Sequence, residues 1–254
     1  MSPEGTAPVY DDIGAGYTRF RRADPRIEAT VHAALGDARR VVNVGAGAGS
    51  YEPVDHTVVA VEPSPEMIRQ RPASAAPCVR ADAAALPFPD DGFDAAMAIL
   101  TVHHWPDPVA GLRELRRVAE GVVLLGFEPL GHRDFWLFRD YVPAVTTLPS
   151  VADALSVQEA AELVEADRIE TVPIPHDCLD GFGCAYWRRP EAYLDPDVRR
   201  CISGFGLLDP DDVLPGIERL REDLESGRWQ AEHAELLDLD ELDCGFRLVV
   251  RDPP

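Results

Sequence analysis

The sequence predicts an α/β fold built on a seven-stranded sheet, mostly parallel with an antiparallel last strand, and with helices on both faces. Short apolar runs alternate with amphipathic helical patterns from residue 40 onwards. Near-continuous apolar runs are typical of strands buried on both faces of a sheet, and strand–helix alternation favours parallel strands joined by helical crossovers. Hydrophobic residues make up 46% of the 254 residues, which is enough for the large core of such a fold.

Local signals predict the individual elements. Asp24 and Pro25 suit the start of a first helix, which Gly36 ends. Ser156 and Glu159 have the spacing of a capping box and therefore begin another helix. Further helices are expected at residues 64–68 and 107–118, in an aromatic lid segment at 132–142, and around Val213, Ile217, Leu220 and Leu224. Strands are expected at residues 39–45, 57–62, 76–82 (the weakest), 93–100, 121–128, 168–175 and 244–252.

Composition and charge exclude several classes of protein. The formal net charge of -21 disfavours a nucleic-acid or anionic-membrane partner, because both carry negative charge. No apolar run has the length of a membrane span, and the first residues do not have the pattern of a secretory signal. The five scattered cysteines form no CxxC pair, so we expect no metal site and a reducing cytoplasm. The basic residues are all arginine, which suggests a GC-rich, bacterial genome.

A glycine-rich turn is the strongest functional signal. Gly45, Gly47 and Gly49 directly follow the first strand, where glycine permits positive φ and leaves room for a ligand. Glu62 ends the second strand and could accept hydrogen bonds from ribose hydroxyls, and Asp82 ends the third. Each acid alone is explained as a helix cap or a solvated loop residue. Three such sites at successive strand ends favour a nucleoside-type ligand, bound where open α/β sheets bind ligands.

The spacing of the glycines distinguishes between two kinds of ligand. The turn reads GxGxG, whereas a dinucleotide fingerprint reads GxGxxG and points helix-start amides at a pyrophosphate. A GxGxG turn more often faces the methionine part of S-adenosylmethionine.

These motifs together resemble those of class I S-adenosylmethionine-dependent methyltransferases, of the ubiquinone/menaquinone and small-molecule type. The matching stretches are VVNVGAGAGS, VVAVEPSPEMI, RADAAALPFPDDGFDAAMAILTVHHWPDP and GLRELRRV. The resemblance implies a Rossmann-like domain and methyl transfer to a small-molecule acceptor, by in-line displacement at the sulfonium methyl. Tyr10 and Tyr17 match a segment that often closes over the cofactor. The further residues implied to bind S-adenosylmethionine are Asn43, Gly45, Ala46, Gly47, Gly49, Glu62, Pro63, Met67, Asp82, Ala83 and Thr101.

One position departs from the family. Asn43 stands where the family usually carries an acid that helps to hold the ammonium group of the cofactor. An amide oxygen accepts a hydrogen bond but carries no full charge. Cofactor binding is therefore expected to be weaker, unless Glu52 compensates.

The expected organisation is one methyltransferase domain. Its parts are an N-terminal segment and first helix at 1–40, a cofactor-binding half at 41–128, and a substrate half at 129–254 with lid insertions near 130–150 and 180–230.

His103 and His104 are the leading catalytic candidates, because they follow the fourth strand and histidine titrates near neutrality. The alternative is a purely structural role in the floor of the site, and this is the favoured interpretation. His176 with Asp177 form a second candidate pair, for which a solvent-exposed turn is the favoured interpretation. Glu128 follows the fifth strand and either faces the site or begins the next loop.

The acceptor pocket is expected to come from the two insertions. Their aromatic residues either enclose a flat or apolar molecule or form the core of a helical cap, and the cap is favoured for at least half of them. Arg188 and Arg189 either bind an acidic group of the substrate or are solvated. The aromatic residues are Phe135, Trp136, Phe138 and Tyr141 in the first insertion and Phe182, Tyr186, Trp187 and Tyr193 in the second.

Two other functions stay open. A nicotinamide-dependent oxidoreductase would share the sheet, the glycine turn and Glu62, but the GxGxG spacing and the lack of a Tyr-x-x-x-Lys pair oppose it. A non-catalytic cofactor-binding module on the same fold is supported only by Asn43. A nucleic-acid methyltransferase is disfavoured, since it would carry a basic surface. The sequence identifies neither the acceptor, nor the atom that is methylated, nor the oligomeric state.

Overall fold

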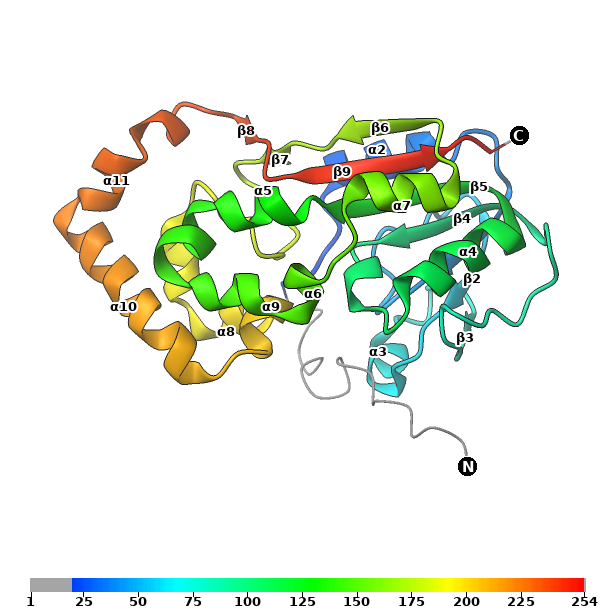
Figure 1. Ribbon diagram of the computed structural model, residues 1–254, viewed down its shortest axis with the longest axis horizontal. Coiled ribbons are helices and arrows are strands. Elements are labelled where there is room, and N and C mark those ends of the chain that lie inside the picture. The colour runs from blue at the N-terminus through cyan, green and yellow to red at the C-terminus, as the bar shows by residue number, and fades with distance from the viewer. Residues whose placement is uncertain (1–19, 254) are drawn as a thin grey trace.

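Seven strands form one mixed sheet in the computed structural model, which describes residues 20–253 (Figure 1). Their order is β3-β2-β1-β4-β5-β9-β6. The last strand, β9, lies between β5 and β6 and runs antiparallel to both, while the other neighbours pair in parallel. The strands are β1 (Arg40–Val44), β2 (Thr57–Val61), β3 (Cys78–Val79), β4 (Phe93–Ile99), β5 (Ala119–Phe127), β6 (Arg168–Thr171) and β9 (Phe246–Arg251). The predicted fold class is confirmed.

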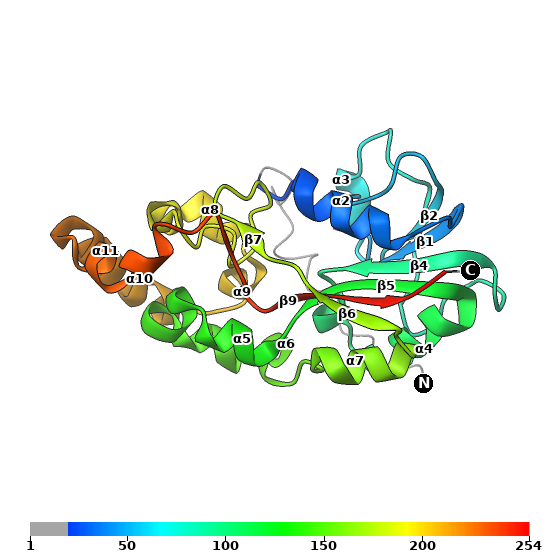
Figure 2. The same ribbon diagram turned by 90° about the horizontal axis from the view of Figure 1, so that it is seen from above.

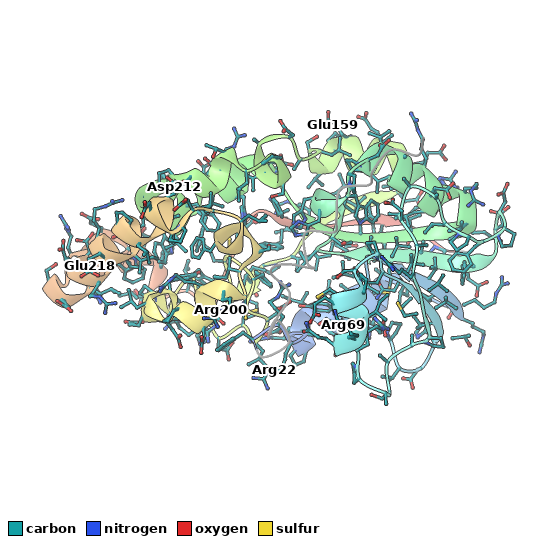
Figure 3. All side chains as sticks on the ribbon, turned by 90° about the horizontal axis from the view of Figure 1, so that it is seen from below. Arg22, Arg69, Glu159, Arg200, Asp212 and Glu218 are labelled. Carbon is teal, nitrogen blue, oxygen red and sulfur yellow. The ribbon has the colours of Figure 1, made fainter. Side chains whose placement is uncertain are left out.

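Helices cover both faces of this sheet (Figure 2). Helices α2 (Pro25–Ala34) and α3 (Pro65–Gln70) lie on one face, and α4 (Pro108–Val118) and α7 (Val157–Val164) lie on the other. Alternate strand residues point to the two faces, so that Val41 packs into the core under α2 whereas Val42 packs into the core under α4. Charged side chains such as Arg69 and Glu159 are on the outside (Figure 3).

The predicted helix starts are confirmed by side-chain caps. Asp24 accepts a hydrogen bond from the Arg26 backbone N–H at the start of α2, and Ser156 with Glu159 forms the complete capping box of α7. Asp107 caps α4 in the same way. Each cap satisfies a backbone N–H that has no partner within its helix, which fixes where the helix begins.

A helical cap extends beyond one end of the sheet (Figure 1). Its elements come from two stretches that flank β6. The first contributes α5 (Pro129–Asp134), the π-helical turn η3 (Leu137–Tyr141), η4 (Pro143–Thr147) and α6 (Pro149–Ala152). The second contributes η5 (Pro190–Leu194), α8 (Pro196–Arg200), α9 (Ser203–Gly206), α10 (Pro210–Ser226), α11 (Arg228–Glu232) and η6 (Ala234–Leu236).

Two expected elements are broken in the structure. The predicted helix at 132–142 is interrupted after Asp134 and resumes as a π-helical turn at Leu137, in a stretch where residues 135–138 are all buried and packing on the cap decides the backbone path. The predicted strand at 168–175 ends at Thr171. Beyond Pro173, which lacks a backbone donor, β7 (Ile174–Pro175) pairs instead with β8 (Glu241–Leu242) in a separate sheet.

The edge strand β3 is shorter than the sequence predicted. The third strand was expected over residues 76–82 but keeps only its central two residues, at the edge of the sheet. Among residues 20–253, no helix has both the length and the apolar character needed to cross a membrane.

Candidate functional site

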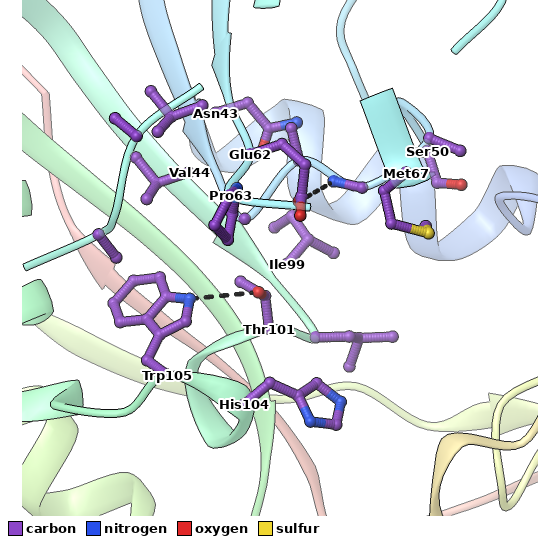
Figure 4. A pocket seen from close by; sticks show the side chains of 18 of the residues that line it. Asn43, Val44, Ser50, Glu62, Pro63, Met67, Ile99, Thr101, His104 and Trp105 are labelled. Carbon is purple, nitrogen blue, oxygen red and sulfur yellow. Dashed lines mark hydrogen bonds between the residues drawn. The ribbon is translucent and has the colours of Figure 1, made fainter. Parts of the chain in front are cut away.

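The carboxyl ends of β1, β2 and β4 surround a cavity of about 370 Å³, called here the strand-end cavity. Figure 4 shows Glu62 and Pro63 on one side of it and Thr101, His104 and Trp105 on the other. The structure therefore brings most of the sequence-predicted binding residues together. Those that line the cavity are Asn43, Gly45, Ala46, Gly47, Glu62, Pro63, Met67, Asp82, Ala83, Thr101 and His104. Tyr10 and Tyr17 lie outside the described residues.

The glycine turn keeps its shape through close packing on Thr101. Gly45 has a φ of +70°, and a Cβ atom there would come within 2.1 Å of the Thr101 hydroxyl oxygen. That hydroxyl in turn accepts a hydrogen bond from the Trp105 indole at 3.2 Å (Figure 4). Gly49 does not line the cavity, and its backbone N–H closes the turn on the Ala46 carbonyl at 2.9 Å.

Glu62 is a buried carboxylate held by the backbone. One of its oxygens accepts from the Gly47 N–H at 2.8 Å, and the other accepts from the Ser64 N–H at 2.9 Å. The side chain is fixed at the end of β2, with only 5% of the residue exposed. A carboxylate offers about four acceptor positions, so Glu62 can also accept from a ligand in the cavity.

Asn43 is connected to a buried ion pair behind the turn. Its amide donates to Glu52 at 3.3 Å, and Glu52 receives the Arg71 guanidinium at 2.6 Å. Arg71 also donates to the Gly47 carbonyl at 3.1 Å, which braces the turn. Glu52 is thus paired with Arg71 and does not line the cavity.

The residues predicted to contact adenine all line the strand-end cavity. Met67 is 2% exposed and lines the cavity with Pro63. Asp82 is exposed and accepts a hydrogen bond from the Ala84 N–H at 2.8 Å, a turn that orients its carboxylate. Ala83 is buried beside it.

A buried network that the sequence did not reveal joins the N-terminal segment to the cap. Asp180 accepts from Arg21 Nε at 2.6 Å and from the Tyr51 hydroxyl at 2.9 Å. Arg21 and Tyr51 both line the strand-end cavity. Burial and the Asp180 charge raise the pKa of Tyr51, so that its hydroxyl stays protonated as a donor. The position of Tyr51 directly after the glycine turn was the only available signal for it.

Two of the four described non-glycine residues with positive φ lie at this cavity. Tyr51 has a φ of 65° and Leu100 a φ of 54°, in the left-handed region that residues other than glycine rarely adopt. Both residues line the strand-end cavity. Such strain persists only where the surrounding structure enforces it, and it is frequent at functional sites.

His103 and His104 lie where three cavities meet. Their ring centroids are 3.9 Å apart. Both line a small cavity of about 60 Å³, called here the aromatic cavity, and a larger one of about 630 Å³, called here the outer cavity. His104 also lines the strand-end cavity, but His103 does not.

The histidines at this junction are neutral near pH 7. Burial, with a smaller contribution from the positive charge of Arg21, lowers the pKa of His104 to about 4. Burial lowers the pKa of His103 well below its usual range, and the neighbouring His104, His132 and Arg21 act in the same direction. Burial also lowers the pKa of His132, across the aromatic cavity, to about 4.

Most aromatic residues of the insertions form the core of the cap. Phe138 and Phe182 line the aromatic cavity, whereas the other six do not line any of the three cavities. The Trp136 indole donates to the Trp187 carbonyl at 3.0 Å, and the Trp187 indole donates to the Ile174 carbonyl at 2.9 Å. Buried Trp side chains with such partners stabilise the cap.

The remaining polar candidates have structural partners. His176 contacts the Asp240 carbonyl, and Asp177 pairs with Arg26 at 2.7 Å. Glu128 accepts from the backbone N–H of Val157 at 3.3 Å, at the start of α7. Arg188 donates to the backbone carbonyl of Leu239, and Arg189 donates to those of Cys178 and Ala185. Within the described part of the chain, no group of three or more His, Cys, Asp or Glu residues could hold a metal ion.

Comparison with known proteins identifies the family. A family profile described as a methyltransferase domain matches residues 42–124. A solved structure from Anabaena variabilis, assigned as a methyltransferase from an antibiotic biosynthesis pathway, is 31% identical with a TM-score of 0.83, over 91% of this chain and 98% of that one. The demethylmenaquinone methyltransferase of Renibacterium salmoninarum is 27% identical over 81% of this chain and 91% of its own length.

A shorter match points in the same direction. The rice 2-methyl-6-phytyl-1,4-hydroquinone methyltransferase 1 is 36% identical over 39% of this chain, and the match spans only 33% of the rice protein. The similarity to the Anabaena structure, in contrast, extends through the sheet and the cap. The chain therefore belongs to the class I S-adenosylmethionine-dependent methyltransferases, enzymes whose cofactor is S-adenosylmethionine.

Proposed function

We propose that this protein transfers the methyl group of S-adenosylmethionine to a small-molecule acceptor, by in-line displacement at the sulfonium methyl. The observation that carries the proposal is the junction of two cavities at Arg21, Leu100 and His104. The strand-end cavity is the proposed cofactor site, and the aromatic cavity is the proposed acceptor site. An acceptor held in the second would lie next to a cofactor held in the first.

The residues around the strand-end cavity fit the cofactor. Glu62 is fixed by two backbone donors and keeps acceptor positions for the two ribose hydroxyls. The buried Met67 and Pro63 offer apolar surface to the adenine ring, and Asp82 offers an acceptor for its amino group. The residues proposed to bind the cofactor are Asn43, Gly45, Ala46, Gly47, Glu62, Pro63, Met67, Asp82, Ala83 and Thr101. Gly49 is proposed to shape the turn, and Tyr17 stays a prediction.

The protein's contribution is proposed to be positioning and exclusion of water. S-adenosylmethionine, when bound, supplies a methyl group on an electrophilic sulfonium sulfur. The packed Thr101–Trp105 contact and the strained Leu100 backbone hold the wall between the two cavities in place. Alignment of two reacting groups contributes up to roughly 7–11 kcal/mol in favourable intramolecular reactions.

His103 and His104 are proposed to hold the acceptor rather than to act as strong bases. A neutral imidazole has one N–H donor and one acceptor nitrogen, so it can orient a polar group of the acceptor. A base with a pKa of about 4, as for His104, takes a proton only weakly from a hydroxyl at neutral pH. Among the two, His104 is the better placed, because it lines both proposed sites.

Three observations support a small molecule as the acceptor. The proposed acceptor site is small and is lined in part by aromatic side chains, a setting that suits small ligands. The net charge of -21 disfavours nucleic acid. Two of the similar proteins named above are methyltransferases of ring-containing quinone or hydroquinone compounds.

The described cysteines are all free, which supports the predicted location in a reducing cytoplasm.

The proposal is tested first by calorimetric titration with S-adenosylmethionine and S-adenosylhomocysteine, with NADH and NADPH as controls. Saturable binding of the two sulfur compounds alone is expected, followed by methylation of at least one compound in an acceptor screen. Binding of a nicotinamide nucleotide alone would favour an oxidoreductase. Tight binding without turnover of any acceptor would favour a non-catalytic module.

A further inference from the structure

Trp105 forms part of the wall between the strand-end cavity and the outer cavity. Of the described residues, only His104, Trp105 and Pro106 line both. Pro106 is exposed, and the ring of His104 lies against that of His103, with which it lines the aromatic cavity. Trp105 has the largest side chain of the three shared residues. Its indole therefore offers the largest surface to this wall.

The indole is fixed at two of its edges. Its N–H donates to the Thr101 hydroxyl at 3.2 Å, as Figure 4 shows. Its six-membered ring packs directly on the backbone of Gly111 in α4, where a Cβ atom would come within 2.4 Å of the ring. The backbone N–H of Trp105 also donates to the Val102 carbonyl at 3.1 Å. A side chain held in this way leaves the wall only if these contacts break.

Gly111 shows how closely α4 is fitted to this indole. Glycine within a helix is destabilising relative to alanine, because it loses more backbone freedom on folding. Gly111 is buried inside α4, and its φ is not in the left-handed region, so its backbone conformation does not require glycine. The space that the Trp105 ring occupies is the feature that excludes a side chain at this position.

Trp105 lies at the end of the strand-end cavity that is proposed to hold adenine. A Cβ atom on Gly111 would lie 3.4 Å from the Ala83 Cβ atom as well as against the Trp105 ring, so Ala83 and Trp105 are neighbours. Ala83 and Asp82 are the residues proposed to recognise the edge of adenine that carries its amino group. The outer cavity adjoins the same indole, and its volume of about 630 Å³ is lined mainly by apolar side chains.

We propose that Trp105 is a specificity-determining residue of the cofactor site, whose fixed indole ends the strand-end cavity at the adenine ring and separates it from the outer cavity. The inference rests on the proposed function, because it takes the strand-end cavity as the cofactor site. It implies that the wild type accepts a cofactor with an unsubstituted adenine amino group and rejects one that is enlarged there. Without the indole, the outer cavity receives the added group.

The test compares the binding of two ligands to the full-length protein by calorimetric titration. The first is S-adenosylhomocysteine, and the second is the same molecule with a benzyl group on the adenine amino nitrogen. An added group in a filled pocket is rejected about tenfold or more, so the wild type should bind the benzyl compound with a Kd at least roughly tenfold higher. In Trp105→Ala the ratio of the two Kd values should fall by about that factor. This variant should also bind S-adenosylhomocysteine itself more weakly, because an apolar contact is lost.

Two more variants separate the partition from other effects. Trp105→Phe keeps a smaller ring, so the ratio should fall by less, and this variant keeps the test decisive if thermal unfolding shows that Trp105→Ala does not fold. Leu207→Ala is the matched control. Leu207 lines the outer cavity but not the strand-end cavity and is 37% exposed, so its truncation enlarges the outer cavity and leaves the partition in place. Its ratio of Kd values should equal that of the wild type.

Tryptophan fluorescence tests separately whether the indole faces the cofactor. The other three tryptophans, Trp136, Trp187 and Trp229, are buried and line none of the three cavities. S-adenosylhomocysteine should therefore change the fluorescence of the wild type but not that of Trp105→Phe, although calorimetry still detects binding to this variant.

The proposal is wrong if the benzyl compound binds the wild type as tightly as S-adenosylhomocysteine, or if both Trp105 variants leave the ratio of Kd values unchanged. It is also wrong if Leu207→Ala lowers the ratio as much as Trp105→Ala, or if the fluorescence change persists in Trp105→Phe. In each of these cases the wild type still binds S-adenosylhomocysteine, and the proposed cofactor site stands. A wild type that does not bind S-adenosylhomocysteine would reject the proposed function, and this inference with it.

Discussion

Replacing Glu62 by glutamine removes one charge from the proposed cofactor site while leaving the shape of the side chain unchanged. In the wild type, the two carboxylate oxygens accept from the Gly47 and Ser64 backbone N–H groups at 2.8 and 2.9 Å. The glutamine amide has only one oxygen. Its NH₂ group must therefore face one of these two N–H donors and leave that donor unsatisfied.

The size of the effect follows from these contacts. A hydrogen bond to a charged group contributes about 1.5–3 kcal/mol, and an unsatisfied buried donor costs about 1–3 kcal/mol. If one charged bond to a ribose hydroxyl is lost and the other is weakened, binding falls by about 2–3 kcal/mol, or roughly 30- to 150-fold in Kd. The free energy of unfolding should fall by about 1–3 kcal/mol as well.

Calorimetric titration with S-adenosylhomocysteine measures the first effect, and urea unfolding measures the second. Glu66→Gln is the matched control. Glu66 lies four residues further along, in α3, and pairs with Arg69 at 2.7 Å, but it does not line the strand-end cavity. A folded Glu62→Gln protein whose Kd stays within threefold of wild type would refute the assignment of Glu62 to the ribose.

Three further changes give predictions of their own. Gly45→Ala should lower the free energy of unfolding by about 2–4 kcal/mol, because Gly45 has a positive φ and its Cβ would come within 2.1 Å of Thr101. Gly227→Ala is the control, since Gly227 has a similar φ of +75° but nothing within 4 Å of its Cβ position. If urea unfolding gives the same loss of stability for both variants, the steric argument is wrong. Asn43→Asp should not tighten S-adenosylhomocysteine binding in calorimetry, and it should destabilise the protein by about 1–2 kcal/mol. The reason is that the new carboxylate would face Glu52, which now accepts a hydrogen bond from Asn43 at 3.3 Å. A Kd that becomes tenfold tighter would contradict this prediction and show that an acid at position 43 favours cofactor binding. Burial lowers the pKa of His132 to about 4, so the folded state binds a proton at His132 less readily than the unfolded state does. The unfolding free energy therefore falls on acidification. The contribution that is lost is fully present above pH 6.5, disappears as the pH falls towards 4, and amounts to about 3 kcal/mol. Urea unfolding at pH 7.5 and 4.5 should show that His132→Phe loses less stability than wild type on acidification, and equal losses would contradict the assignment.

The sheet and the residues that line the strand-end cavity could be predicted because their signals are local. A buried strand is an apolar run, a helix start is a cap residue at a fixed spacing, and a glycine turn is a short motif. Ser156 and Glu159 illustrate this, since both bonds of their capping box form within four residues. Glu62 was found in the same way, because the end of a parallel strand fixes where its side chain lies.

The failures occurred where packing overrides local preference. The segment at 132–142 has the composition of a helix, but it changes from α-helix to a π-helical turn across four consecutive buried residues, where contacts with the rest of the cap decide the backbone path. Pro173 ended a strand that the apolar pattern continued. The ion pair of Glu52 could not be predicted for a related reason. Its partner, Arg71, lies 19 residues away, and nothing in the sequence marks the two as a pair.

Asp180 shows why the acceptor side of the site could not be deduced from the sequence. It is one of many acids in a chain of net charge -21, and it lies in a loop without a motif. Its hydrogen-bond partners are Arg21, which is 159 residues away, and Tyr51, which is 129 residues away. A buried carboxylate is costly unless it is paired, so its burial is itself the sign that the fold relies on these contacts. They bring an N-terminal guanidinium, the residue after the glycine turn and a wall of the aromatic cavity to one point. The proposed acceptor side is therefore assembled from distant segments, whereas the proposed cofactor site lies along consecutive strand ends.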